Sequence, residues 1–514
     1  MRLCKLGILI LVLGLCACRS QSIPSPTAAT STPSSKTPLA PPTSAPANWI
    51  HPANFAGSWY PADPTTLSNE IDRWLAANDP VDGAPIGLIV PHAGYVYSGA
   101  VAAEGFRQLR QGDYQLAVII AADHQAPLSQ PIAIWPKGGF ETPLGMVAVD
   151  EATAQALIET SSLIHADPAA FQGEHPIELE LPFLQRTCPQ CRIVPILMGD
   201  KNPETIEALS NALSQVLAGK KAVIIASSDL AHYPPYSQAL VIDRATLFAI
   251  ETGDPLYLQQ TTKRLMSVGF TNLVTCACGE GPILVTMRAA KALGANTTTL
   301  LRYANSGETP YGKRDQVVGY GAVMLWHYAP PELTNSRRQA LLALARKAIE
   351  DYLEGEKASL TSDDPVLNRR AGVFVTLKEG QALRGCIGRL RADLPLYQAV
   401  QEMAIAAATA DPRFPPLKKS ELKDLRIEIS VLSPLRPVTD TKSIRIGTHG
   451  LLIIQGQRRG VLLPQVAQEE GWSRKEFLEN LCYKAGLEGD CWHKEGSLLY
   501  SFQAIVFGED LSHQ

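Results

Sequence analysis

The sequence lacks an excess of charge of either sign. Its 46 lysines and arginines nearly balance 50 aspartates and glutamates, which gives a formal net charge of -4, and the signs are interspersed. This balance excludes the extended basic surface on which nucleic-acid-binding proteins depend. Beyond its N-terminal segment the chain also lacks any apolar run long enough to span a bilayer. We therefore expect no nucleic-acid partner and no membrane-spanning domain.

A second CxxC motif is also missing. The single "CPQC", Cys188 to Cys191, could be a redox pair or half of a zinc site, but without a second pair it completes no four-cysteine site. We expect a local disulfide or incidental cysteines rather than catalysis. After residue 18 the chain has seven cysteines, so at least one thiol is free or metal-bound if the others pair in an oxidising compartment.

The N-terminus has the pattern of an export signal. Arg2 and Lys5 precede a short apolar core that ends in "LCAC", as in a secretory signal peptide rather than a membrane span. The ending resembles a bacterial lipobox, in which Cys18 would be lipidated. Cys16 departs from the usual pattern, and an ordinary signal peptide or an uncleaved anchor is the alternative. Residues 1–18 therefore predict an exported, membrane-anchored lipoprotein of the bacterial cell envelope.

Residues 19–48 consist almost entirely of Ser, Thr, Pro and Ala. With so few large apolar side chains the segment cannot offset the entropy lost on ordering, so we expect a disordered linker between anchor and globular part. The length of the chain exceeds what one hydrophobic core organises and predicts two or three domains.

Residues 49–328 alternate apolar runs with amphipathic stretches of helical period. The runs are uniformly apolar and rich in Val and Ile, which is typical of strands covered on both faces, and the alternation predicts a three-layer α/β domain. Polar residues follow three of these runs, at His92, at His124 and at the pair Asp229 and His232. Because open α/β sheets bind ligands outside the carboxyl ends of their strands, we expect these side chains to form a pocket.

A second, α+β domain is predicted over residues 336–508. Residues 336–355 and 395–410 have the period of amphipathic helices, and 425–433 and 450–456 have the composition of strands.

The first domain resembles the Memo family, the B component of the AmmeMemoRadiSam system. The resemblance rests on ordered blocks across residues 51 to 326: "AGSWYPAD", "PHAGYVYSG", "ADHQAPLS", "GEHPIELELPFL", "SSDLAHY", "CGEGPI" and "YANSGE...VVGYGAVML". It implies a fold similar to the class III extradiol dioxygenases and a metal site of His92, His124 and Cys278. Asp229 and His232 match residues beside the metal, and Glu174 and His175 lie in a further block. Gln125 stands where the family usually has a second histidine.

The residue chemistry agrees with that implied site. Two imidazoles and a thiolate leave positions open for water or substrate, as catalytic sites do. Imidazole suits iron, zinc and copper, and thiolate favours zinc and cuprous copper, so the ligands leave the metal open. We favour iron or copper, with zinc as the alternative. Cys276 competes with Cys278 for the ligand role, and His92 could simply end a strand. His232 would transfer protons, with Asp229 orienting it; a helix-start cap and a surface histidine are the plainer reading of that pair.

The second domain resembles the AMMECR domain, the A component of the same system. The blocks that carry it are "LRGCIGRL", "ATADPRFPPL", "EISVLSP" and "GVLLPQVAQEEGWSRKEFLENLCYKAGL". The resemblance implies a shared pathway with a radical SAM protein. Cys386, between Gly385 and Gly388, is the candidate nucleophile, although a close-packed turn explains the same pattern.

Other polar residues surround this motif in the sequence. Arg384, Asp411 and Arg413 would line a binding cleft with Cys386, or form a solvated ion pair. His449 and His493 are the available bases, and spacing does not place them near the thiol.

The leading hypothesis is an exported metal-binding protein with a redox or dioxygenase-like site that acts on a small-molecule or peptide ligand. The alternatives are a non-catalytic metal-binding or ligand-binding scaffold, and a hydrolase of the zinc type with His232 as base.

Overall fold

The computed structural model of the chain describes residues 49–509, apart from 126, 357–360, 381 and 495. The predicted signal peptide, the linker and the lipid attachment at Cys18 lie outside the described residues. Within the described residues no helix combines the length and the apolar character needed to cross a membrane.

The first part of the chain is built on a mixed sheet whose strand order is β10-β11-β2-β9-β3-β8-β4-β7. Its strands are β2 (Pro85–Val90), β3 (Leu116–Ala122), β4 (Ile132–Ile134), β7 (Ile164–Ala166), β8 (Arg192–Met198), β9 (Ala222–Ser227), β10 (Thr297–Asn305) and β11 (Gly319–Trp326). β2, β9, β3 and β8 run parallel to one another, whereas β11 is antiparallel to β2 and β4 to β8. The predicted parallel strands are thus present and form the centre of the sheet.

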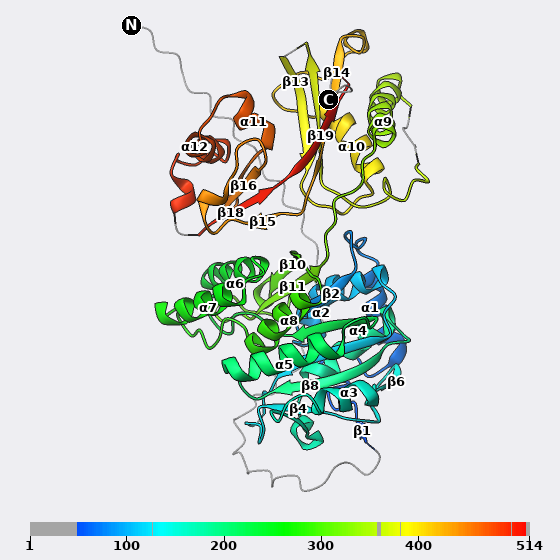
Figure 1. The fold of residues 1–514 in the computed structure, drawn as a ribbon, viewed down its shortest axis with the longest axis vertical. Helices are drawn as coiled ribbons and strands as arrows, with labels where there is room; N and C mark the ends of the chain where they lie inside the picture. The colour runs from blue at the N-terminus through cyan, green and yellow to red at the C-terminus, as the bar shows by residue number, and fades with distance from the viewer. Residues whose placement is uncertain (1–48, 126, 357–360, 381, 495, 510–514) are drawn as a thin grey trace, which may run out of the picture. The chain divides into compact units, whose positions relative to one another are not determined.

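Helices cover both faces of this sheet (Figure 1). One face packs against α3 (Glu151–Ile158), α5 (Pro203–Val216) and α8 (Glu280–Ala292), and the other against α1 (Pro64–Leu75), α2 (Tyr95–Arg107) and α4 (Pro176–Thr187). α6 (Tyr236–Glu251) packs on β10 and β11, and α7 (Pro255–Val268) on α6 and α8. A small sheet adds β1 (Ile50–His51), β5 (Gly139–Thr142) and β6 (Gly145–Ala148). The central strands are buried on both faces, which explains their uniformly apolar sequence and confirms the three-layer α/β architecture.

Local sequence signals fix where these helices begin. The Asp63 carboxylate accepts a hydrogen bond from the Thr66 N–H at the start of α1, and Pro64 occupies the first turn. Asp254 caps α7 in the same way, and Gly269 ends α7 in the left-handed conformation at φ 80°.

The second part has the predicted α+β composition. An antiparallel sheet of order β13-β12-β14-β19 packs against α9 (Asn335–Glu354) and α10 (Leu396–Thr409). Its strands are β12 (Val373–Glu379), β13 (Ala382–Arg389), β14 (Leu425–Leu432) and β19 (Ala504–Gly508). A second sheet, β15 (Arg436–Pro437), β18 (Ser497–Phe502), β16 (Gly450–Gln455) and β17 (Arg458–Leu462), carries α11 (Pro464–Glu469) and α12 (Arg474–Lys484).

Two disulfides lie among the described cysteines. Cys188 pairs with Cys191, which is one of the two possibilities left open from the sequence, and Cys482 pairs with Cys491. Cys276, Cys278 and Cys386 are free thiols.

Candidate metal centre

The carboxyl ends of three neighbouring strands bring the predicted polar residues together. His92 lies two residues after β2, His124 two residues after β3, and Asp229 two residues after β9, which runs between those strands. The pocket expected at this edge of the sheet is therefore present, because parallel strands deliver their following loops to one place.

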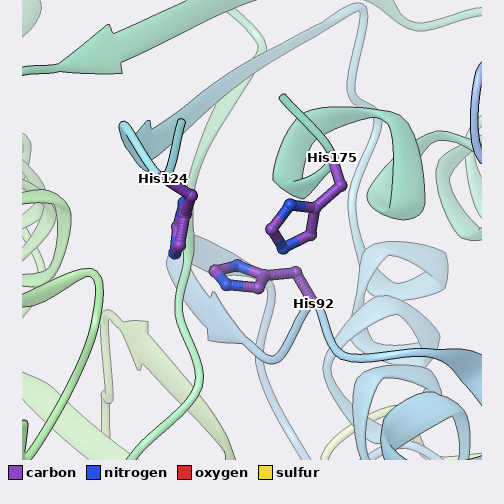
Figure 2. Close-up of side chains that lie close together, drawn as sticks. All are labelled: His92, His124 and His175. Atoms are coloured by element: carbon purple, nitrogen blue, oxygen red, sulfur yellow. The ribbon is translucent and has the colours of Figure 1, made fainter. Parts of the chain in front are cut away.

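Three imidazoles face one another across this edge (Figure 2). His175, at the start of α4, joins His92 and His124, with ring centroids 5.0 to 5.3 Å apart. One ligand nitrogen from each ring lies within 4.8 Å of the other two. His92 and His175 are buried, and the side chain of His124 is 22% exposed. The cluster could hold a metal ion.

Cys278 approaches the same cluster from the loop before α8. Its Sγ lies 3.4 Å from His92 Nε2, and it also hydrogen-bonds with His124. The loop fits only because residue 279 is glycine: a Cβ there would stand 2.7 Å from the Ser227 carbonyl oxygen. Cys276, the competing thiol, instead faces the Thr262 carbonyl, and burial raises its pKa to about 12. Of the two thiols, Cys278 is the one placed beside the histidines.

The Nδ1 nitrogens of His92, His124 and His232 each have a partner within the protein. Nδ1 of His92 lies 2.8 Å from the Ser227 hydroxyl, and Nδ1 of His124 lies 2.9 Å from the carbonyl oxygen of Ala122. Nδ1 of His232 is likewise 2.9 Å from the Leu230 carbonyl oxygen. Metal-binding histidines are usually oriented by such contacts, which leave Nε2 for the ion.

Asp229 has a different role from the one expected. Its carboxylate accepts hydrogen bonds from the backbone N–H groups of His92, at 3.0 Å, and Ala93, at 3.3 Å. Among the described residues it makes no hydrogen bond to His232, whose ring is oriented by Leu230 instead. The helix-start alternative also fails, because residues 229–232 form an extended loop. Asp229 therefore positions His92 rather than His232.

Burial sets the charge state of the site in the absence of an ion. It lowers the pKa of His92 well below its usual value, and the neighbouring imidazoles lower it further. Burial also lowers the pKa of His175 to about 4 and raises that of Asp229 to about 7. Burial lowers the pKa of His124 as well, but its hydrogen bonds with Cys278 and Glu174 outweigh this effect and raise the pKa to about 10. Without an ion, His92 and His175 are therefore neutral imidazoles, whereas His124 keeps its proton at neutral pH.

An open cavity of about 940 Å³ lies over the histidines. The cavity is lined by the site residues His92, His124, His175, Asp229 and His232. Its aromatic wall consists of Trp59, Tyr97, Tyr233 and Tyr311. This volume is typical of small-molecule sites.

Sequence reasoning gave His175 no chemical role. Its ring packs on Trp59 with centroids 4.3 Å apart, and its backbone precedes Pro176, the first residue of α4. The available signal was the place of His175 in the family block "GEHPIELELPFL". Only the docking of α4 on the sheet brings that position to the strand ends.

Cys386 lies on β13 in a setting that favours a structural role. The Thr376 hydroxyl lies 3.3 Å from Sγ, and burial raises the pKa of the thiol. Asp411 accepts a hydrogen bond from the Cys386 N–H, and Arg413 donates to the Cys386 carbonyl oxygen. The Arg413 guanidinium also lowers the pKa of the Cys386 thiol, but burial outweighs this effect. Arg384 instead pairs with Glu421.

Neither predicted base reaches this thiol. His449 accepts a hydrogen bond from the Arg445 N–H, His493 stacks near Trp492, and no described contact joins either to Cys386. A Cβ at position 385 would stand 2.2 Å from the Ala407 carbonyl oxygen, which explains the glycine by close packing. Catalysis by Cys386 stays a prediction.

The fold and the cluster together define a class: three-layer α/β proteins with a histidine and cysteine site at the carboxyl edge of a parallel sheet. A family model described as Memo-like protein matches residues 51–324, more than half of the chain, and a model described as AMMECR1 matches residues 342–507. The chain belongs to the Memo-like family, with an AMMECR1 region after the Memo-like one.

Several known proteins are similar to parts of this chain. A MEMO1 family protein of Ignicoccus hospitalis is 33% identical over 288 residues, which are 53% of this chain and 98% of the relative. A protein of Methanothermobacter thermautotrophicus is 48% identical over 191 residues, 36% of this chain and 98% of the relative. The solved structure of an uncharacterized Pyrococcus horikoshii protein shares 41% identity over 34% of this chain and 91% of its own, with a TM-score of 0.33.

Proposed function

We propose that residues 49–328 bind one transition-metal ion through His92, His124 and Cys278 and use it in a redox or dioxygenase-like reaction. The observation that carries the proposal is the convergence of these imidazole and thiol side chains beneath an open cavity. His175 lies close enough to join them as a further ligand or to contact the substrate.

The donor set fits such an ion. Imidazole suits iron, copper and zinc, and a thiolate adds preference for zinc and cuprous copper. The Nδ1 contacts of His92 and His124 leave Nε2 of both rings for the ion. Metal-binding histidines are commonly oriented in this way, by a hydrogen bond from the ring nitrogen that does not bind the metal. Iron or copper is favoured for a redox reaction.

When bound, the ion would supply Lewis acidity and, if redox-active, electron transfer. The chain supplies the positioning and the proton transfer. The aromatic wall of the cavity would contact a small-molecule or peptide substrate. His232, whose pKa burial lowers, is neutral at neutral pH, and its Nε2 accepts a proton while Nδ1 donates to the Leu230 carbonyl.

Metal analysis of protein purified without added metal tests the proposal, with His92→Ala and Cys278→Ala as site variants. Cys276→Ala is the matched control, since that thiol faces away from the histidines. We expect about one iron or copper per chain in the wild type and the control, with loss in both site variants. Full metal content in both site variants would overturn the site.

Metal analysis together with activity assays separates the alternative functions. Tight zinc with hydrolysis of model esters or amides, and no oxygen consumption, would indicate the hydrolase. Stoichiometric metal without turnover of any kind would indicate the non-catalytic scaffold.

We also propose that the protein is exported and anchored in the bacterial cell envelope through a lipid on Cys18. The two disulfides support an oxidising compartment, where such bonds persist. Labelling of cells with a radioactive fatty acid tests the anchor: Cys18→Ser should abolish labelling, and Cys4→Ser should not. Unchanged labelling of the Cys18 variant would refute it.

The joining of Memo-like and AMMECR1 regions in one chain supports a further proposal, that both act in one pathway with a radical SAM protein. Binding of the purified radical SAM protein to the full chain would be measured by calorimetry. Absence of binding and of any effect on turnover would count against the partnership.

A further inference from the structure

A buried chain of hydrogen bonds leads away from His92 into the protein. His92 Nδ1 lies 2.8 Å from Ser227 Oγ, and Ser227 Oγ lies 2.7 Å from Glu180 Oε1. The three residues come from the end of β2, the end of β9 and the middle of α4. His92 is 2% exposed, Ser227 0% and Glu180 1%, so no bulk water competes for these bonds.

The serine hydroxyl decides the direction of the chain. The Ser227 hydroxyl has one hydrogen and donates it to Glu180 Oε1, so its oxygen is left to accept from the Nδ1–H of His92. Burial raises the pKa of Glu180 well above its usual value, and a protonated Glu180 that carries its hydrogen on Oε2 still accepts through Oε1. An imidazole that offers Nε2 to a metal ion carries its single hydrogen on Nδ1, the nitrogen that lies against Ser227. Placing that hydrogen on Nδ1 leaves the Nε2 lone pair free on the side of Cys278 and the cavity.

Packing does not account for the carboxyl group of Glu180. Glu178, two residues earlier on α4 and equally buried, accepts hydrogen bonds from the N–H groups of Asn54 and Phe55 and from the Tyr60 hydroxyl. Those bonds tie the segment 54–60 to the helix. Glu180 has only the Ser227 bond, and its Oε2 is buried with no hydrogen-bond partner among the described residues. A buried carboxyl group with so few hydrogen bonds costs stability. Its presence therefore points to a role other than packing.

We propose that Glu180 is a positioning residue for the metal centre: through Ser227 it holds the hydrogen of His92 on Nδ1 and directs Nε2 to the ion. This inference rests on the proposed function and extends it to the residues behind the ligands. Partners of this kind fix the tautomer and ring orientation of metal-binding histidines and change metal affinity by about 10- to 100-fold.

The tautomer of His92 tests the hydrogen-bond order without any metal. Imidazole nitrogen NMR spectra of the metal-free, ¹⁵N-histidine-labelled chain would be recorded, with the His92 signals assigned from a His92→Gln variant. We expect the wild type to carry its hydrogen on Nδ1, and Ser227→Ala to populate both tautomers. A wild-type spectrum with the hydrogen on Nε2, or one unchanged by Ser227→Ala, would overturn the inference.

Zinc affinity, measured by competition with a chromophoric chelator, tests the consequence. Glu180→Leu, which removes the acceptor of the Ser227 hydroxyl, and Ser227→Ala should each weaken zinc binding by about tenfold or more. Glu178→Leu is the matched control, since it removes an equally buried carboxyl group from the same helix, and it should leave zinc affinity unchanged.

The outcomes separate the two proposals. Equal zinc affinity in the wild type, Glu180→Leu and Ser227→Ala would overturn the role of Glu180 and leave the proposed function standing. An equal loss in Glu178→Leu would reduce Glu180 to a general structural role. Absence of zinc, iron and copper binding by the wild type would overturn the proposed function, and the inference with it.

Discussion

Removing the Cys482–Cys491 disulfide should destabilise the AMMECR1 region by an amount that the loop length sets. The two cysteines are separated by 9 positions, and both are buried in the core around α12 and β16. In the chain-entropy model a closed loop of about ten residues restricts the unfolded chain by about 2.7 kcal/mol. For a region of this size that corresponds to a fall in Tm of about 5–11 °C.

The perturbation is the double variant Cys482→Ala/Cys491→Ala, followed by denaturant unfolding and calorimetry without reductant. The Cys188–Cys191 disulfide supplies an internal comparison, because its separation of 3 predicts a smaller loss of about 1.9 kcal/mol. Alanine fills each buried site without introducing a polar group, so the comparison isolates the cross-link as far as substitution allows.

Thiol titration provides the independent check. The unfolded, unreduced chain should show three thiols from residues 49–509, those of Cys276, Cys278 and Cys386, and reduction should expose four more. An unchanged Tm in the Cys482/Cys491 variant, or seven thiols before reduction, would refute the reasoning and remove the support for an oxidising compartment.

Two further substitutions probe how the backbone places the site. Gly279→Ala puts a Cβ 2.7 Å from the Ser227 carbonyl oxygen and should displace the Cys278 loop. We expect the free energy of unfolding to fall by about 1–3 kcal/mol and metal to be lost. Unchanged stability in denaturant unfolding would contradict this expectation. Asp229→Ala leaves the N–H groups of His92 and Ala93 without their acceptor and should lower the free energy of unfolding by about 1–3 kcal/mol, whereas Asp229→Asn, which keeps an acceptor oxygen, should lower it less. Equal losses in the two Asp229 variants would show that the hydrogen bonds are not the cause.

The pocket at the carboxyl ends of the strands was predictable from local sequence, because uniformly apolar strands that alternate with helices imply parallel pairing. Parallel pairing then places His92, His124 and Asp229 at neighbouring strand ends whatever the details of packing. For this reason the predicted pocket and the α/β architecture agree with the structure. Cys278 came from the family resemblance, and the structure places its Sγ beside His92.

Other features depend on how elements dock, which local sequence does not encode. His175 reaches the site only because α4 packs across the sheet, and Glu180 reaches Ser227 for the same reason. The direction of the Asp229 side chain depends on the backbone of the loop after β2. The Cys482–Cys491 pair joins the end of α12 to a following turn, and spacing alone does not distinguish it from other pairings.

The most direct test of the central claim is an X-ray absorption spectrum of the metal in the protein as purified. Coordination by His92, His124 and Cys278 predicts imidazole scattering together with one sulfur at about 2.3 Å if the metal is zinc, and the sulfur signal should disappear in Cys278→Ser. A spectrum with imidazole but no sulfur would contradict the thiolate ligand and point to His92, His124 and His175. A metal without imidazole scattering would contradict the site as a whole.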